Sequence, residues 1–198
     1  MPMAGTVSAL VSQRRGHFRM ESGYHTAAWF ELGSLFDDPL ELRPFVSELA
    51  RRLSSHGLAA VCGPMSGGAK LAEMIASELG VACLIAERFE TRASGMFPVA
   101  YRIPAGQRRN ASGTSVAIVD DAISAGSAVR GAYADLVACG ARPVALGALI
   151  VFGEAATGFA ADAGLALEAI ERLPLDLWPP QDCPLCNAGV ALEAVTAA

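Results

Sequence analysis

Residues 116–130 read Val-Ala-Ile-Val-Asp-Asp-Ala-Ile-Ser-Ala-Gly-Ser-Ala-Val-Arg, and this stretch decides the fold. Its apolar, β-branched first part is typical of a central strand in a parallel sheet, which is buried on both faces. Open α/β sheets place their ligands where the chain leaves the carboxyl end of such a strand. We therefore expect a strand over residues 115–119, then a ligand site, then a helix over residues 128–139.

Acidic groups and an anion-binding turn follow this strand directly. Asp120 and Asp121 stand at its end, and residues 124–128 offer backbone amides, two hydroxyls and the start of a helix. Amides at a helix N-terminus suit a phosphate monoester. A phosphate next to acceptors for hydroxyl groups indicates a sugar phosphate. The alternative is a generic nucleotide-fold strand followed by an N-capped helix. The residues of the turn are Ser124, Ala125, Gly126, Ser127 and Ala128.

The rest of the chain alternates between strand and helix patterns. Apolar residues recur at helical spacing, and glycines follow several of these runs, as expected at helix ends. Such alternation predicts an α/β fold with a mostly parallel sheet flanked by helices and with right-handed crossovers. Residues 88–114 look irregular, and residues after Gly189 look helical. The expected helices are 39–55, 69–79 and 128–139, and the expected strands are 58–62, 81–86, 115–119 and 143–151.

A second glycine-rich turn lies between the strand at 58–62 and the helix at 69–79. Its glycines let backbone amides approach an anion closely at a helix N-terminus. We interpret Met65, Ser66, Gly67 and Gly68 as a pyrophosphate-binding turn, the alternative being an ordinary glycine-rich connection. Two anion sites at the ends of successive strands are what a doubly phosphorylated ribose needs.

Composition limits the class of protein. The chain has 198 residues, of which 53% are hydrophobic and 18% charged, with a net charge of -5. This predicts one compact domain with a small ligand, and the negative charge argues against a nucleic-acid partner. The apolar run at 144–152 is too short to span a bilayer, so we expect no membrane partner and a cytoplasmic protein. The five cysteines fit reduced thiols better than a disulfide framework.

The stretch at 116–130 resembles the phosphoribosyl-pyrophosphate signature of type I phosphoribosyltransferases, and most closely that of orotate phosphoribosyltransferases. The segments at 16–39 and 173–186 are similar to the two ends of that family, so the resemblance spans nearly the whole chain. It implies that Asp120 and Asp121 hold the ribose hydroxyls and that residues 124–128 hold the 5′-phosphate. It also implies that Arg130 contacts the carboxylate of orotate.

The resemblance extends to the fold and to further site residues. It implies a single phosphoribosyltransferase domain over residues 1–198, with a core at about 39–171 and a small hood built from about 1–38 and 172–198. Trp29 falls where the family places an aromatic residue near the pyrimidine, although plain core packing is the alternative. Arg88 matches a catalytic arginine of a mobile loop. The candidates for additional positive charge at the donor are Arg92, Arg102, Arg108 and Arg109.

The chain departs from the family in its lysines. Lys70 is its only lysine, whereas family members usually carry several functional ones. Phe89 stands where a loop lysine is common, and Glu21 and Leu32 stand where the N-terminal segment often has lysine. Arginine does not simply replace lysine. Which arginine supplies the missing charge, and whether the loop is still catalytic, stays open at this point.

The activity that the resemblance implies is Mg²⁺-dependent transfer of phosphoribosyl from phosphoribosyl pyrophosphate to orotate, by a homodimer. The alternatives are a transferase for another base and a non-catalytic sensor that binds the same donor. A sensor would keep the two anion-binding turns and the aspartates without needing the loop cations. We see no basic stripe or DNA-binding helix pair in the sequence.

The tail contains Cys183-Pro-Leu-Cys186, which can be half of a zinc site or a redox motif. No second cysteine pair or adjacent histidine completes a tetrahedral set along the chain, so we assign no protein-held metal site from the sequence. His17 and His25 are interpreted as structural histidines.

Overall fold

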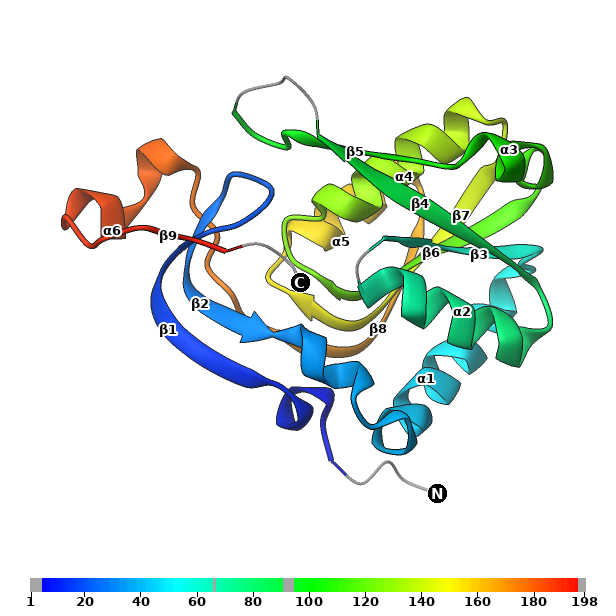
Figure 1. Ribbon diagram of the computed structural model, residues 1–198, viewed down its shortest axis with the longest axis horizontal. Helices are drawn as coiled ribbons and strands as arrows, with labels where there is room; N and C mark the ends of the chain where they lie inside the picture. Colours follow the sequence, from blue (N-terminus) through cyan, green and yellow to red (C-terminus); the bar gives the residue numbers. More distant parts are fainter. Residues whose placement is uncertain (1–4, 66, 91–94, 196–198) are drawn as a thin grey trace.

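The computed structural model describes residues 5–65, 67–90 and 95–195 (Figure 1). Within them the main sheet has the order β5-β4-β3-β6-β7-β8, and a smaller sheet has the order β2-β1-β9. The main strands are β3 (Ala60–Pro64), β4 (Ala82–Glu90), β5 (Val99–Arg102), β6 (Ser115–Ile123), β7 (Arg142–Phe152) and β8 (Ala166–Leu173). The helices around them are α1 (Pro39–Leu53), α2 (Gly67–Leu79), α3 (Ala105–Ala111), α4 (Ser127–Ala138) and α5 (Ala155–Ala163).

The main sheet is parallel except at one edge, where β5 runs antiparallel to β4. The chain moves from β3 outward to β4 and β5, then returns to the other side of β3 for β6, β7 and β8. The strand order therefore reverses between β3 and β6. At such a switch point the connections leave in opposite directions, which opens a crevice at the carboxyl ends of the strands. The expected α/β class and mostly parallel sheet are confirmed.

Strand β6 shows why the sheet is buried on both faces. Val116 and Ile118 belong to the core formed with α3, α4 and α5, whereas Ala117 and Val119 belong to the core formed with α1 and α2. Alternate side chains of a strand point to opposite faces, so a strand between two helix layers must be apolar throughout.

The smaller sheet, which we call the hood sheet, joins the two ends of the chain. It contains β1 (Ser12–Arg19), β2 (His25–Glu31) and β9 (Glu193–Ala194), with β2 antiparallel and β9 parallel to β1. The short helix α6 (Pro184–Asn187) lies in the tail that leads to β9 (Figure 1). This arrangement confirms the hood expected from the N- and C-terminal segments.

Several boundaries differ from the sequence-based expectations. Strand β6 continues through the aspartates to Ile123, because β7 still pairs with it there, with Asp120 opposite Ala148. The stretch at 88–114, expected to be irregular, contains the end of β4 together with β5 and α3. The expected helix after Gly189 is wrong, since the tail there pairs with β1 as β9. Helix α5 and strand β8 were not among the expected elements.

Among the residues that the structure describes, no helix combines the length and the apolar character needed to cross a bilayer.

Candidate active site

A cavity of about 560 Å³ lies between the hood sheet and the carboxyl ends of β3 and β6. This volume suits a small ligand. Its wall includes most of the predicted site residues, from both turns predicted to bind anions, the acidic pair and the hood. They are Met65, Gly67, Asp120, Asp121, Ser124, Ala125, Gly126, Ser127, Ala128 and Trp29. The tertiary fold thus brings the two turns to one site.

The acidic pair is buried. Asp120 is 6% and Asp121 8% exposed. Strand β3 pairs with β6 only as far as Ile118, so the aspartates lie beyond the end of that neighbour and face the crevice. Burial, and then the charge of Asp121, hold the pKa of Asp120 well above its usual range. Burial also raises the pKa of Asp121, although its carboxylate accepts a hydrogen bond from the backbone amide of Ala122 at 2.8 Å.

The first turn packs directly against these carboxylates at the start of α2. A Cβ on Gly67 would overlap the carboxylate of Asp121, and a Cβ on Gly68 would lie 2.6 Å from Asp120 Oδ1. Only glycine fits at either position without a shift. The glycines of the turn therefore allow the acidic pair and the helix N-terminus to share one small volume.

The second turn leads into α4 and is shaped by Gly126, whose φ of 82° is in the left-handed region that favours glycine. Ser127 then begins the helix. Its hydroxyl donates a hydrogen bond to Glu21 Oε1 at 3.2 Å. A carboxylate thus lies at the turn that the sequence assigns to a phosphate.

The carboxylate of Glu21 accepts hydrogen bonds from side chains of three different elements. Besides Ser127, the hydroxyl of Tyr101 donates to Glu21 Oε1 at 3.1 Å, and Arg88 Nε donates to Oε2 at 2.9 Å. Burial, followed by the charge of Glu21, raises the pKa of Tyr101, so that its hydroxyl keeps its proton. The sequence indicates Glu21 only as a position without the common lysine; its contacts depend on the fold.

The remaining predicted residues have different surroundings. In the part of the chain that the structure describes, neither Arg88 nor Gly68 is on the cavity wall. Ser66 and Arg92 lie outside the described residues, so the roles expected for them stay predictions.

Arg130 supports the second turn from outside the cavity wall. Its Nε donates to the carbonyl oxygen of Ala125 at 3.2 Å and its guanidinium also donates to Ala155 O at 3.4 Å. The guanidinium lies 4.3 Å from the centre of the Phe159 ring, a cation–π contact. The role at the orotate carboxylate that the resemblance implies stays a prediction.

Lys70 is a cavity residue to which the sequence analysis assigned no role. It lies on the first turn of α2, lines the cavity, and has its ammonium 5.3 Å from the centre of the Phe36 ring. Its charge opposes the effect of burial on the pKa of Asp121. Its position three residues after Gly67, one helical turn, was the available signal.

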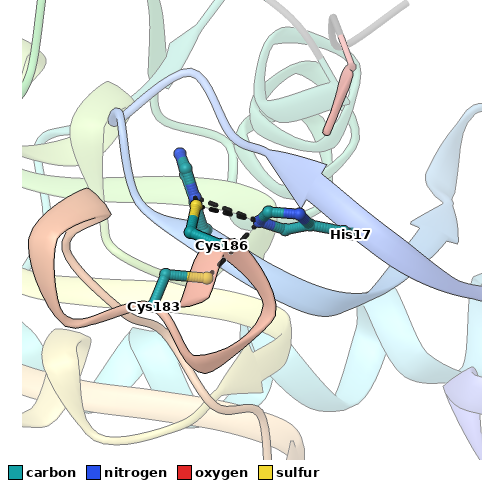
Figure 2. A group of neighbouring side chains, drawn as sticks. His17, Cys183 and Cys186 are labelled. Carbon is teal, nitrogen blue, oxygen red and sulfur yellow. Dashed lines mark hydrogen bonds between the residues drawn. The ribbon is translucent and has the colours of Figure 1, made fainter. Parts of the chain in front are cut away.

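The tail brings together four residues that are far apart in the sequence. Cys183 and Cys186 meet His17 of β1 (Figure 2), and His25 at the start of β2 completes the group. The sequence analysis looked for a histidine adjacent to the cysteine pair along the chain, whereas the fold brings two histidines to the pair from distant strands. Adjacency along the chain was the wrong criterion, because the hood sheet supplies both histidines.

Comparisons with known proteins agree with this geometry. No family model matches the chain. The orotate phosphoribosyltransferase of Thermotoga maritima is 30% identical over 181 residues, which cover 90% of this chain and 88% of that protein. The chain belongs to the orotate phosphoribosyltransferase family. A second family member, from Desulforamulus reducens, is 29% identical over 178 residues, or 88% of this chain and 85% of that protein.

Solved structures share the fold of this family member. The crystal structure of orotate phosphoribosyltransferase from Aeropyrum pernix matches with a TM-score of 0.64 at 20% identity, over 84% of this chain and 89% of that one. Adenine phosphoribosyltransferase from Trypanosoma brucei, in complex with AMP, pyrophosphate and ribose-5-phosphate, matches with a TM-score of 0.65 at 15% identity, over 84% of this chain and 77% of that one. These likenesses establish the type I phosphoribosyltransferase fold.

Proposed function

We propose that this protein transfers the 5-phosphoribosyl group of phosphoribosyl pyrophosphate to orotate, giving orotidine 5′-phosphate and pyrophosphate. The observation that carries the proposal is the cavity wall, where residues of two anion-binding turns and the buried pair Asp120 and Asp121 meet in a chain of the orotate phosphoribosyltransferase family. The proposal treats residues 1–198 as one domain, in a cytoplasmic homodimer, on the strength of the family resemblance.

In this proposal, residues of the cavity wall bind the separate groups of the donor. The amides of residues 124–128 and the Ser127 hydroxyl hold the 5′-phosphate at the start of α4. Asp120 and Asp121 accept hydrogen bonds from the ribose hydroxyls. Their negative charge stabilises the positive charge that develops on the ribose as pyrophosphate leaves. The turn at Gly67 lies next to them and holds the departing pyrophosphate, with the ammonium of Lys70 on the same wall.

The donor set fits Mg²⁺. Asp120 and Asp121 are buried carboxylates, and carboxylate and phosphate oxygens are the ligands that this ion takes. In this proposal the two aspartates hold it together with the donor. When bound, the ion would supply positive charge that offsets the negative charge of the leaving pyrophosphate.

The acceptor is placed by the hood and by α4. Trp29 lines the cavity from β2, and an aromatic ring there suits a planar pyrimidine. Arg130 takes the orotate carboxylate, as the resemblance implies. For this its guanidinium exchanges the 3.4 Å contact with Ala155 O for the ligand, while Nε continues to support Ala125.

One observation favours a second candidate function, donor binding without turnover. Glu21 accepts the hydrogen bond of the Ser127 hydroxyl and forms an ion pair with Arg88, the arginine expected to act on phosphoribosyl pyrophosphate. A carboxylate there opposes binding of phosphate and reduces the cationic charge available to the transition state.

The test is pyrophosphate release from phosphoribosyl pyrophosphate and Mg²⁺, with orotate compared with uracil, adenine, hypoxanthine and no base. Donor binding is measured in parallel by calorimetry. Release with orotate alone supports the proposal, and release with another base moves the activity to that base. Donor binding without release from any base supports the second candidate, whereas absence of both overturns the two together.

A further inference from the structure

The group formed by His17, His25, Cys183 and Cys186 has the geometry of a metal site. One potential ligand atom from each residue lies within 4.8 Å of all the others. His17 Nε2 lies 3.1 Å from His25 Nδ1 and 3.4 Å from Cys183 Sγ. Cys186 Sγ lies 3.7 Å from His17 Nε2 and 3.3 Å from His25 Nδ1. Figure 2 shows both sulfurs directed at the His17 ring.

These separations match the edges of a tetrahedron around zinc. With Zn–N of about 2.05 Å and Zn–S of about 2.3 Å, tetrahedral geometry places the two nitrogens about 3.3 Å apart and each nitrogen about 3.6 Å from each sulfur. In the structure the two nitrogens lie 3.1 Å apart, and three of the nitrogen–sulfur pairs lie 3.3, 3.4 and 3.7 Å apart. The remaining separations are all within 4.8 Å, so modest shifts of the ligand atoms bring all four to one ion.

Hydrogen bonding alone accounts poorly for this convergence. His17 Nδ1 lies 2.8 Å from the carbonyl oxygen of Val190, which only accepts, so Nδ1 carries the hydrogen and Nε2 presents a lone pair. Three polar atoms surround that one lone pair at 3.7 Å or less. The Val190 carbonyl is instead the kind of outer partner that orients a metal-bound histidine.

Charge and burial also suit a zinc ion. His17 and His25 are each 3% exposed and Cys183 is fully buried, whereas Cys186 lies on the exposed side of the group. Two thiolates and two neutral imidazoles around Zn²⁺ carry no net charge, which limits the cost of burying the site. The ligand set and the Cys-x-x-Cys spacing are those of closed structural zinc sites, because thiolate sulfur and imidazole nitrogen are the ligands that zinc prefers.

We propose that His17, His25, Cys183 and Cys186 bind one zinc ion in tetrahedral coordination, and that this ion joins the C-terminal tail to the N-terminal hairpin beside the active-site cavity. On binding, the S–H bond of each cysteine is replaced by a Zn–S bond, the two protons go to solvent, and the imidazole nitrogens bind the ion through their lone pairs.

The ion has a structural purpose in this position. The hood sheet is small, and β9 pairs with β1 over only two residue pairs. Small units with little core depend on such links. Between the two histidines the chain carries Met20, Glu21 and Ser22, which line the cavity, and past Cys186 it reaches Val195 on the same wall. Zinc therefore fixes one side of the ligand site without contacting the ligand.

The experiment measures metal in the full chain, purified without an affinity tag that binds metal and under a reducing agent that keeps the thiols free. After incubation with Zn²⁺ and desalting, we expect about one zinc per chain by mass spectrometry. Cys183→Ser and Cys186→Ser are expected to lose it. Cys139→Ser, at the half-buried cysteine that caps the C-terminus of α4 outside the group, is the matched control and is expected to keep it.

A spectroscopic measurement on the unaltered chain covers variants that fail to fold. Co²⁺ in place of zinc is expected to give the intense visible bands of a tetrahedral site together with thiolate charge-transfer absorption. Zinc well below one per chain after reconstitution, zinc retained in the double variant Cys183→Ser/Cys186→Ser, or octahedral Co²⁺ spectra would each overturn the proposal. Metal content is read independently of catalysis, so this result does not depend on the proposed activity.

Discussion

The substitution Glu21→Gln is expected to tighten binding of phosphoribosyl pyrophosphate. The side chain keeps its shape and one accepting oxygen. Its negative charge is lost, and its other oxygen is replaced by an amide group that donates hydrogen bonds. In the structure Ser127, Tyr101 and Arg88 donate hydrogen bonds to the charged carboxylate, which lies at the turn assigned to the 5′-phosphate. An anionic ligand in this turn and the Glu21 carboxylate repel each other.

The size of the effect follows from the contact with Ser127. A phosphate bonded to the Ser127 hydroxyl at about 2.8 Å lies within roughly 6 Å of Glu21, because the carboxylate is 3.2 Å from the same oxygen. Repulsion between unit charges at 6 Å is about 3 kcal/mol at an effective dielectric constant of 20 and about 0.7 kcal/mol in water. The Glu21 side chain is 21% exposed and is paired with Arg88, which favours the lower part of this range. We expect about 1 kcal/mol, roughly a fivefold lower Kd.

Isothermal titration calorimetry with phosphoribosyl pyrophosphate and Mg²⁺ measures this change. Glu31→Gln is the matched control, since Glu31 also lines the cavity and its contact is with Arg14 instead of the turn. We expect its Kd to stay close to that of the unaltered chain. A Kd for Glu21→Gln that is unchanged or higher would refute the reasoning, because it would mean that the carboxylate leaves the turn before the donor binds. A fall in Kd that the control reproduces would attribute the effect to overall charge.

Three further predictions follow from the same site. Burial raises the pKa of Asp120, so its ionised form is disfavoured in the folded state and stability is lost as pH rises through that raised pKa. Asp120→Asn should therefore have a higher Tm than the unaltered chain at pH 7, and calorimetry should show this advantage vanish near pH 4. A difference in Tm that does not depend on pH would contradict the raised pKa of Asp120. Gly67→Ala should lower the unfolding free energy by about 1–3 kcal/mol in denaturant titrations, because the added methyl group overlaps Asp121. Gly106→Ala in α3, where a Cβ meets nothing within 4 Å, should leave the unfolding free energy unchanged, and equal losses would point to a general effect of alanine. Arg130→Ala should raise the KM for orotate about tenfold to a hundredfold, with a smaller change in the KM for the donor, since a hydrogen bond to a charged group is worth about 1.5–3 kcal/mol. An unchanged KM for orotate in steady-state kinetics would show that Arg130 does not contact the acceptor.

Local pattern was sufficient for the framework of the protein. The apolar run at 116–119 predicts a doubly buried strand, and the small residues after it predict a turn at a helix N-terminus, because both features depend on neighbours in the chain. The structure confirms the strand and its helix, and places the turn on the cavity wall. The extension of β6 to Ile123 was missed, since it depends on hydrogen bonds to β7.

The tertiary structure alone decided which charged groups share the site. The Ser127–Glu21 contact joins residues 106 positions apart, and the contacts of Cys183 with His17 and of Cys186 with His25 join residues 166 and 161 positions apart. Periodicity and turn chemistry report on a few neighbouring residues, and they carry no information on which distant segments meet. Composition also showed that Lys70 is the only lysine, but its place on the cavity wall follows from the packing of α2 at the switch point between β3 and β6. The sequence by itself thus determined the strand, the turns and the acidic pair, whereas the contacts of Glu21 and the histidine–cysteine group arise only when the hood sheet closes the two ends of the chain together.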